Sequence, residues 1–191
     1  MLISHSHKFI TIDIPKTGTG SRRITLTPLG VIDYTGPPKA ENGMHQHGTV
    51  VEAKRGFRGK GWCFDDYLKF SVVRNPWERY VSLYKWTNKK YPNINISLDN
   101  IISRSQSQDK YILNKDMSVG VDKIGRFENF NETFNMLCSS VDISPVPDLK
   151  HLNKTHYDNP LTEYYTQELI DMVTEKEKWV IDKFKYKFNG T

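Results

Sequence analysis

The chain is poor in cysteine and contains no long apolar run. Cys63 and Cys138 are the only two cysteines among 191 residues, and they form no CxxC pair. Two distant cysteines provide no disulfide framework, so we expect free thiols in a reducing compartment. No apolar stretch reaches the ~20 residues that a membrane-spanning helix needs, and no apolar segment typical of a signal peptide follows Met1. These absences argue against a disulfide-rich secreted domain and against a membrane protein, and they predict a cytoplasmic chain with no membrane partner.

The composition that remains is typical of a folded domain. Hydrophobic residues make up 37% and charged residues 26%, with ten Tyr, nine Phe and four Trp, which is too aromatic and too evenly charged for a disordered chain. The length suffices for one domain with a sizeable core. No repeat or linker divides the chain, so we expect residues 1–191 to form a single domain. The net charge of +5 is compatible with an anionic ligand and equally with solubility alone.

The stretch Lys8–Arg23 joins a strand-like run to a loop rich in glycine and hydroxylated residues. The apolar run from Phe9 to Ile14 predicts a buried strand that ends at Pro15. Residues 17–21, Thr-Gly-Thr-Gly-Ser, predict a tight loop that leads into a helix, where glycines and unpaired N–H groups can approach an anion. The stretch therefore predicts a P-loop-like phosphate-binding loop after the first strand, with a ligand-free glycine-rich turn as the alternative.

Lys16 stands at an unusual position for a phosphate-binding loop. In a Walker A loop, GxxxxGK[ST], the lysine follows the glycines, whereas Lys16 precedes Gly18 and Gly20. An ordinary P-loop NTPase is therefore disfavoured. Successive backbone N–H groups at a helix N-terminus still provide an anion-binding nest.

A second strand ends in a second candidate anion site. The segment Tyr67–Val73 is apolar enough for a buried parallel strand, and Arg74 follows it directly. Asn75 is suited to cap a helix that begins with Pro76. Because ligands of open α/β sheets bind at the carboxyl ends of the strands, we expect Arg74 and the Lys16 loop on one rim, facing a ligand with two separate phosphates. The alternative is that Arg74 pairs with an acidic side chain and only positions the helix.

Strand–loop–helix units of this kind predict the fold class. Two of them, with further helices between and after, indicate an α/β fold with a central parallel β-sheet flanked by helices. Residues 123–127 predict either a further strand or a loop. The other helices are expected at residues 20–28, 49–57, 98–104, 131–140 and 162–184.

FITIDIPKTGTGS followed by KFSVVRNPWERYVSLY resembles the sulfotransferases that use 3′-phosphoadenosine 5′-phosphosulfate (PAPS), especially their carbohydrate-type branch. These proteins have one strand that ends in Pro-Lys-Thr-Gly and another that ends in Val-Arg-Asn-Pro, with a serine eight residues after the arginine. Here the arginine is Arg74 and the serine is Ser82. IGRFENF, HLNKT (151–155) and the C-terminal segment extend the resemblance from about Phe9 to Phe188.

The resemblance implies roles for individual residues. Lys16 would contact the bridging oxygen of the phosphosulfate and stabilise the charge of the leaving group. Arg74 and Ser82 would hold the 3′-phosphate, and the Arg126 segment would lie near the adenine. The loop would wrap the 5′-phosphate with Thr17, Gly18, Thr19, Gly20 and Ser21. The family usually has Thr or Ser where this chain has Gly20, so the hydroxyl that contacts the phosphate stays open.

A base is needed for the acceptor hydroxyl, and three residues between the two phosphate motifs are candidates. Relatives place a His or Glu in this region. His47 is favoured because it precedes Gly-Thr and a helix, as the histidine of the family tends to do. His45 and Glu52 are the alternatives, and any of the three can instead be an ordinary surface residue.

Histidine pairs also raise the question of a metal. His5 and His7, like His45 and His47, alternate as strand ligands of zinc can, but no third ligand follows at a suitable spacing. The chemistry that the resemblance implies requires no metal, and none is expected.

These observations predict a sulfotransferase that moves a sulfuryl group from PAPS to a hydroxyl, or to an amine, most naturally of a saccharide, with adenosine 3′,5′-bisphosphate as the product. One alternative is a Mg²⁺-dependent nucleotide phosphotransferase with an atypical loop, for which Asp13 is the nearest metal ligand. The other is a non-catalytic polyanion-binding module. The basic run Lys54–Lys60 suits an anionic acceptor or a solvated turn. No nucleic-acid-binding motif occurs, so no nucleic acid is expected as a partner.

Overall fold

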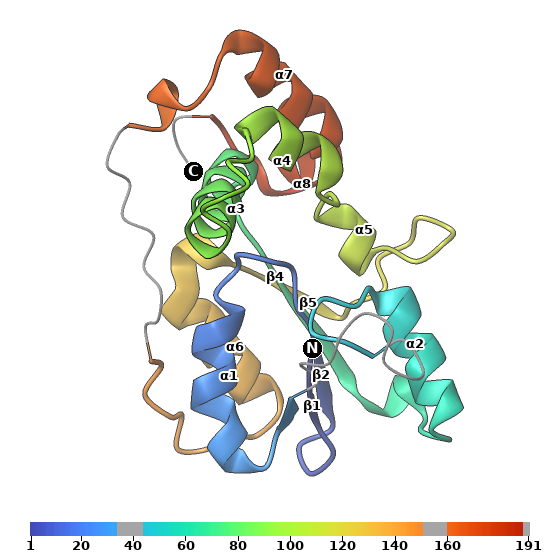
Figure 1. Ribbon diagram of the computed structural model, residues 1–191. Helices are drawn as coiled ribbons and strands as arrows, with labels where there is room; N and C mark the ends of the chain where they lie inside the picture. Colours follow the sequence, from blue (N-terminus) through green and yellow to red (C-terminus); the bar gives the residue numbers. More distant parts are fainter. Residues whose placement is uncertain (34–43, 151–159, 189–191) are drawn as a thin grey trace. The chain divides into compact units, whose positions relative to one another are not determined.

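The computed structural model describes residues 1–33, 44–150 and 160–188 (Figure 1). The chain divides into two compact units, which we describe separately. Met1–Val73 and Lys110–Asn153 form the first, called the sheet unit, and Arg74–Asp109 and Lys154–Thr191 form the second, called the helical unit. The single domain predicted over residues 1–191 stays a prediction. Within the described ranges, no helix combines the length and the apolar character that a membrane crossing requires.

The sheet unit is built on five strands in the order β3-β1-β2-β4-β5. Their bounds are Leu2–Ser4 (β1), Phe9–Ile12 (β2), Ile32–Asp33 (β3), Leu68–Val73 (β4) and Lys123–Arg126 (β5). Strands β2, β4 and β5 are parallel, whereas β1 is antiparallel to both β2 and β3. The predicted α/β fold is confirmed, but the sheet is mixed. Only residues 5–8 connect β1 to β2, and so short a turn permits antiparallel pairing alone.

The register of the parallel strands aligns their carboxyl ends. Ile12 pairs with Ser71, whose hydroxyl donates a hydrogen bond of 2.7 Å to the Ile12 carbonyl. Val73 pairs with Arg126. The loop after β2 and the segment after β5 therefore leave the sheet at the same edge.

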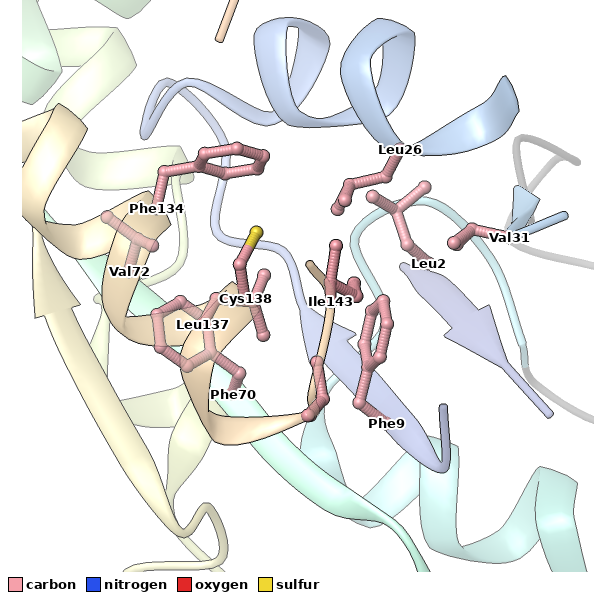
Figure 2. Packing of buried hydrophobic residues seen from close by; sticks show 11 residues of the cluster. Leu2, Phe9, Leu26, Val31, Phe70, Val72, Phe134, Leu137, Cys138 and Ile143 are labelled. Atoms are coloured by element: carbon pink, nitrogen blue, oxygen red, sulfur yellow. The ribbon is translucent and has the colours of Figure 1, made fainter. Parts of the chain in front are cut away.

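Helices α1 and α6 cover one face of this sheet, and α2 lies on the other side of the strands (Figure 1). Figure 2 shows Phe9 and Phe70 from the strands packed against Leu26 of α1 and Leu137 of α6. Each fully buried Phe of this kind contributes roughly 1.5–3 kcal/mol. The helices of this unit are α1 (Thr19–Leu26), α2 (Val50–Gly59) and α6 (Phe130–Ser140), with α5 (Asp109–Ile112) at its border.

The helical unit contains α3 (Pro76–Lys90), α4 (Leu98–Arg104), α7 (Gln167–Lys176) and α8 (Lys178–Phe184). The predicted start of α3 is confirmed, because the Asn75 side chain accepts a hydrogen bond from the Glu78 N–H and Pro76 is the first helical residue. The helical pattern predicted over residues 162–184 is interrupted at Glu177. Short 3₁₀ helices complete the two units at Thr27–Leu29, Phe64–Asp66, Phe127–Asn129 and Leu161–Glu163.

Candidate active site

The predicted phosphate-binding loop connects β2 to α1. Its backbone turns twice through the left-handed region, at Lys16 with φ of 71° and at Gly18 with φ of 77°. Gly18 is the N-cap of α1 and supplies no capping side chain, so the first N–H groups of the helix receive no bond from an N-cap side chain. A helix start of this kind, after two left-handed residues, is suited to bind an anion.

The loop hydroxyls differ in their surroundings. Thr17 Oγ1 donates a hydrogen bond of 2.8 Å to the Ile14 carbonyl and stabilises the turn. Thr19 is only 6% exposed, and its Oγ1 is buried without a hydrogen-bond partner. Because an unsatisfied buried hydroxyl costs about 1–3 kcal/mol, Thr19 is the loop residue best suited to receive an oxygen of a ligand. Ser21, which is also buried, makes a contact of its own.

A buried ion pair between Arg22 and Asp13 stabilises the loop, and it was not predicted from the sequence. Arg22 donates a hydrogen bond of 2.7 Å to the Thr17 carbonyl and one of 3.0 Å to Asp13 Oδ1. The second carboxylate oxygen of Asp13 lies 3.1 Å from the Met1 amino nitrogen. Burial raises the pKa of Asp13, but the charges of the Met1 amino group and Arg22 outweigh it and hold this pKa below its ordinary value. A cation near the positive N-terminal end of a helix is unfavourable unless an acidic group compensates it. The position of Arg22 was therefore the one local sign in the sequence that this residue has an acidic partner.

His47 precedes α2 and contacts the same loop. Its Nδ1 donates a hydrogen bond of 2.8 Å to the Asp13 carbonyl. Because a carbonyl only accepts, the proton of the neutral ring is on Nδ1 and the lone pair is on Nε2. Burial is the main cause that lowers the pKa of His47, and the charges of the Met1 amino group and Arg23 act in the same direction. A neutral imidazole with its lone pair on Nε2 is the form that a general base requires.

The two alternative bases have other roles in the described structure. Glu52 closes a capping box at the start of α2, because its carboxylate accepts a bond of 2.7 Å from the Thr49 N–H and its own N–H donates to Thr49 Oγ1. His45 Nε2 lies 3.8 Å from Glu52 Oε2. The geometry therefore favours His47, as the sequence did.

The Arg126 segment reaches the loop through two aromatic rings. A Cβ atom added at Gly18 would lie 2.5 Å from Phe130 Cζ and 3.2 Å from Phe127 Cε2, so both rings contact the loop backbone. The backbone of Arg126 is held by Thr133, whose hydroxyl accepts from its N–H at 3.0 Å and donates to its carbonyl at 2.8 Å. Neither phenylalanine was predicted to belong to the site.

The candidates for the second phosphate lie in the helical unit. Arg74 Nη2 is 3.2 Å from Glu78 Oε2. Arg74 therefore has an acidic partner, as the alternative interpretation of the sequence predicted. Glu78 and Ser82 are four residues apart and lie along one face of α3, and Arg74 precedes the first residue of this helix by two positions. Arg74 and Ser82 are both buried. Because the loop belongs to the sheet unit, the clamp of two phosphate sites stays a prediction.

Comparison with protein families adds to this geometry. A family model described as the sulfotransferase family matches residues 1–118, which is more than half of the chain. The chain belongs to the sulfotransferase family. The match includes the loop, His47, Arg74 and Ser82, and ends before Arg126. No curated protein and no solved structure matches the chain.

The sulfotransferase contains the histidine pairs that suggested a metal, and two of these rings have other partners. His5 Nδ1 is 2.6 Å from the hydroxyl of Tyr67, and His7 Nδ1 donates to the Val141 carbonyl at 3.1 Å. Across residues 1–33, 44–150 and 160–188, no three side chains of His, Cys, Asp or Glu gather as a metal site would require. The HLNKT segment lies outside the described residues.

The loop of the sulfotransferase requires glycine at position 18 for two reasons, and a matched pair of variants separates them. Gly18→Ala is expected to lower the free energy of unfolding by about 2–5 kcal/mol, from left-handed strain and the overlap with Phe130. Gly30→Ala is expected to cost only about 1–2 kcal/mol, because Gly30 has a φ of 74° but no atom within 4 Å of an added Cβ. Urea unfolding measures both. Equal losses would show that the aromatic contact does not confine the loop.

Proposed function

We propose that this sulfotransferase transfers a sulfuryl group from PAPS to a hydroxyl, or an amine, of a saccharide. The observation that carries the proposal is the loop after β2, where the buried and unpartnered hydroxyl of Thr19 lies at a helix start without a capping side chain. Lys16 precedes this helix start by three residues. An anion that carries a phosphate oxygen to this position satisfies a hydroxyl and backbone N–H groups together.

The residues present fit the donor. Lys16 would lie at the bridging oxygen, and Thr17, Gly18, Thr19, Gly20 and Ser21 would hold the 5′-phosphate. Arg74 and Ser82 would hold the 3′-phosphate, with the Arg126 segment near the adenine. When bound, PAPS supplies a sulfuryl group activated by its anhydride bond to phosphate.

The side chains of the sheet unit account for the proton and the charge. His47 Nε2 accepts the proton of the acceptor, and the bond from Nδ1 to the Asp13 carbonyl keeps the ring in the required tautomer. The Lys16 ammonium and the N–H groups at the start of α1 stabilise negative charge on the leaving phosphate oxygen. Arg22 keeps these N–H groups in place through its bond to the Thr17 carbonyl.

The proposals of a saccharide acceptor and of a cytoplasmic location rest mainly on features of the sequence. The saccharide rests on the resemblance to the carbohydrate-type branch, and four exposed cations along α2 and at its C-cap suit an acidic sugar: Lys54, Arg55, Arg58 and Lys60. A cytoplasmic location agrees with two free thiols, of which Cys63 is exposed and Cys138 is buried.

A Mg²⁺-dependent phosphotransferase is disfavoured by the surroundings of Asp13. Both carboxylate oxygens of this fully buried residue face cations of the chain, the Met1 amino group and Arg22. A Mg²⁺ ion bound to this carboxylate would have to displace both cations. Mg²⁺ also usually keeps several of its waters, for which a fully buried carboxylate is poorly suited.

Calorimetric titration with adenosine 3′,5′-bisphosphate, with and without Mg²⁺, tests the proposal. We expect binding that does not depend on Mg²⁺, because the phosphate contacts proposed for the loop, Arg74 and Ser82 include no metal. Binding of ATP only in the presence of Mg²⁺ would favour the phosphotransferase. The absence of nucleotide binding would favour a polyanion-binding module.

A further inference from the structure

A glutamine in the helical unit holds the backbone of Arg74 at two points. Gln108 Oε1 accepts a hydrogen bond of 2.9 Å from the Arg74 N–H, and Gln108 Nε2 donates one of 2.9 Å to the Arg74 carbonyl. The Gln108 side chain is completely buried. Two bonds to both peptide groups of one residue restrict its φ and ψ, and with them the direction in which its side chain leaves the backbone.

Gln108 is itself held by a buried carboxylate. Glu177, between α7 and α8, has no exposed surface and accepts from the Gln108 N–H at 3.1 Å and from Gln108 Nε2 at 3.4 Å. Its other oxygen accepts from Arg79 Nη2 at 2.7 Å and from the Tyr80 hydroxyl at 2.9 Å. Arg79, which is also buried, balances the charge of Glu177, as burial of a carboxylate requires.

The contacts form a chain from Glu177 through Gln108 to Arg74. We propose that Gln108, oriented by Glu177, is a positioning residue for Arg74 and thereby sets the affinity for the 3′-phosphate of the nucleotide. This inference rests on the proposed function, in which Arg74 binds that phosphate. The ion pair with Glu78 restrains the guanidinium at its outer end, whereas Gln108 fixes the backbone from which the side chain starts.

A comparison of two nucleotides isolates this role from general stabilisation. Adenosine 3′,5′-bisphosphate and adenosine 5′-monophosphate share the adenine and the 5′-phosphate, and only the first carries a 3′-phosphate. The ratio of their dissociation constants therefore reports the 3′-phosphate site alone. A substitution that destabilises the fold without changing the position of Arg74 lowers the melting temperature but leaves this ratio unchanged.

Gln108→Met keeps the length of the side chain and removes both bonds to Arg74. We expect it to reduce the preference for adenosine 3′,5′-bisphosphate about tenfold, as the loss of two buried hydrogen bonds predicts, with unchanged affinity for the monophosphate. Gln108→Asn keeps the amide and adds no charge beside Glu177, but it is one methylene shorter and cannot hold both backbone groups of Arg74 as Gln108 does, so a smaller reduction is expected. This second variant decides the test if the methionine variant does not fold.

Tyr80→Phe is the matched control. It removes a hydrogen bond to the same Glu177 carboxylate but none to Gln108 or Arg74. It is expected to lower the melting temperature and to leave the preference unchanged. An unchanged preference in the Gln108 variants would overturn the positioning role. If the wild-type protein itself binds both nucleotides equally, the 3′-phosphate site of the proposed function is wrong, and the inference fails with it.

Discussion

His47→Gln is expected to lower kcat by about 10²–10⁴-fold, which is the range for the loss of a general base. Glutamine is close to histidine in size, and its side-chain amide accepts no proton near neutral pH, so the variant removes the base with little change in volume. The measurement is the initial rate of release of adenosine 3′,5′-bisphosphate from PAPS with a saccharide acceptor. His45→Gln, two residues earlier, is the matched control and is expected to retain most of the rate.

The pH profile gives a second readout for the same residue. Burial lowers the pKa of His47 below its ordinary value of 6.5, so the ring stays neutral as the pH falls to that value. We expect the acidic limb of kcat/KM to have its midpoint below 6.5 and to disappear in His47→Gln. The native state binds this proton less tightly than the unfolded state does, so protonation of His47 also destabilises the fold as the pH falls below about 6.5. A wild-type limb that persists unchanged in the variant would assign the base to another group.

Lys16→Ala is expected to lower kcat by about 10²–10³-fold, as the removal of one donor to a developing negative charge does in other enzymes. The variant should fold, because lysine and alanine meet the same left-handed strain at a φ of 71°. The expected loss arises from charge on the leaving oxygen, so it should appear in kcat more than in the dissociation constant for adenosine 3′,5′-bisphosphate.

Lys8→Ala is the control for this variant. Lys8 also has a positive φ, of 48°, and carries the same charge at the opposite end of β2, where its ammonium lies 4.9 Å from the centre of the Tyr67 ring. We expect the rate of Lys8→Ala to equal that of the wild-type protein. Full turnover in Lys16→Ala would contradict the proposed mechanism.

Local sequence patterns predicted the elements that carry the site. The apolar run before Pro15 and the Asn75-Pro76 pair placed β2 and the start of α3, because strand burial and helix capping act over a few residues. The hairpin of β1 and β2 was not predicted. Leu2–Ser4 is too short to show an alternating pattern, and its pairing is visible only in the fold.

The supporting contacts of the site were beyond local patterns because their partners are distant in the sequence. Gln108 and Glu177 lie 69 positions apart, and no spacing rule connects a buried amide to a buried carboxylate over that interval. The contact of Phe130 with Gly18 is of the same kind. Ser82 was assigned from the family resemblance, since a serine on a helix has no distinguishing pattern of its own.

The carboxylate of Glu177 has a consequence for engineering. The family match ends at residue 118, so a chimera that transplants only the matched segment carries Arg74 and Gln108 but leaves the carboxylate behind. In such a chimera Arg79 loses the buried carboxylate of Glu177, and Gln108 loses the two bonds that this carboxylate accepts from it. A transplant that keeps the carboxylate beside Gln108 and Arg79 must include Glu177, between α7 and α8, although this residue lies outside the matched segment.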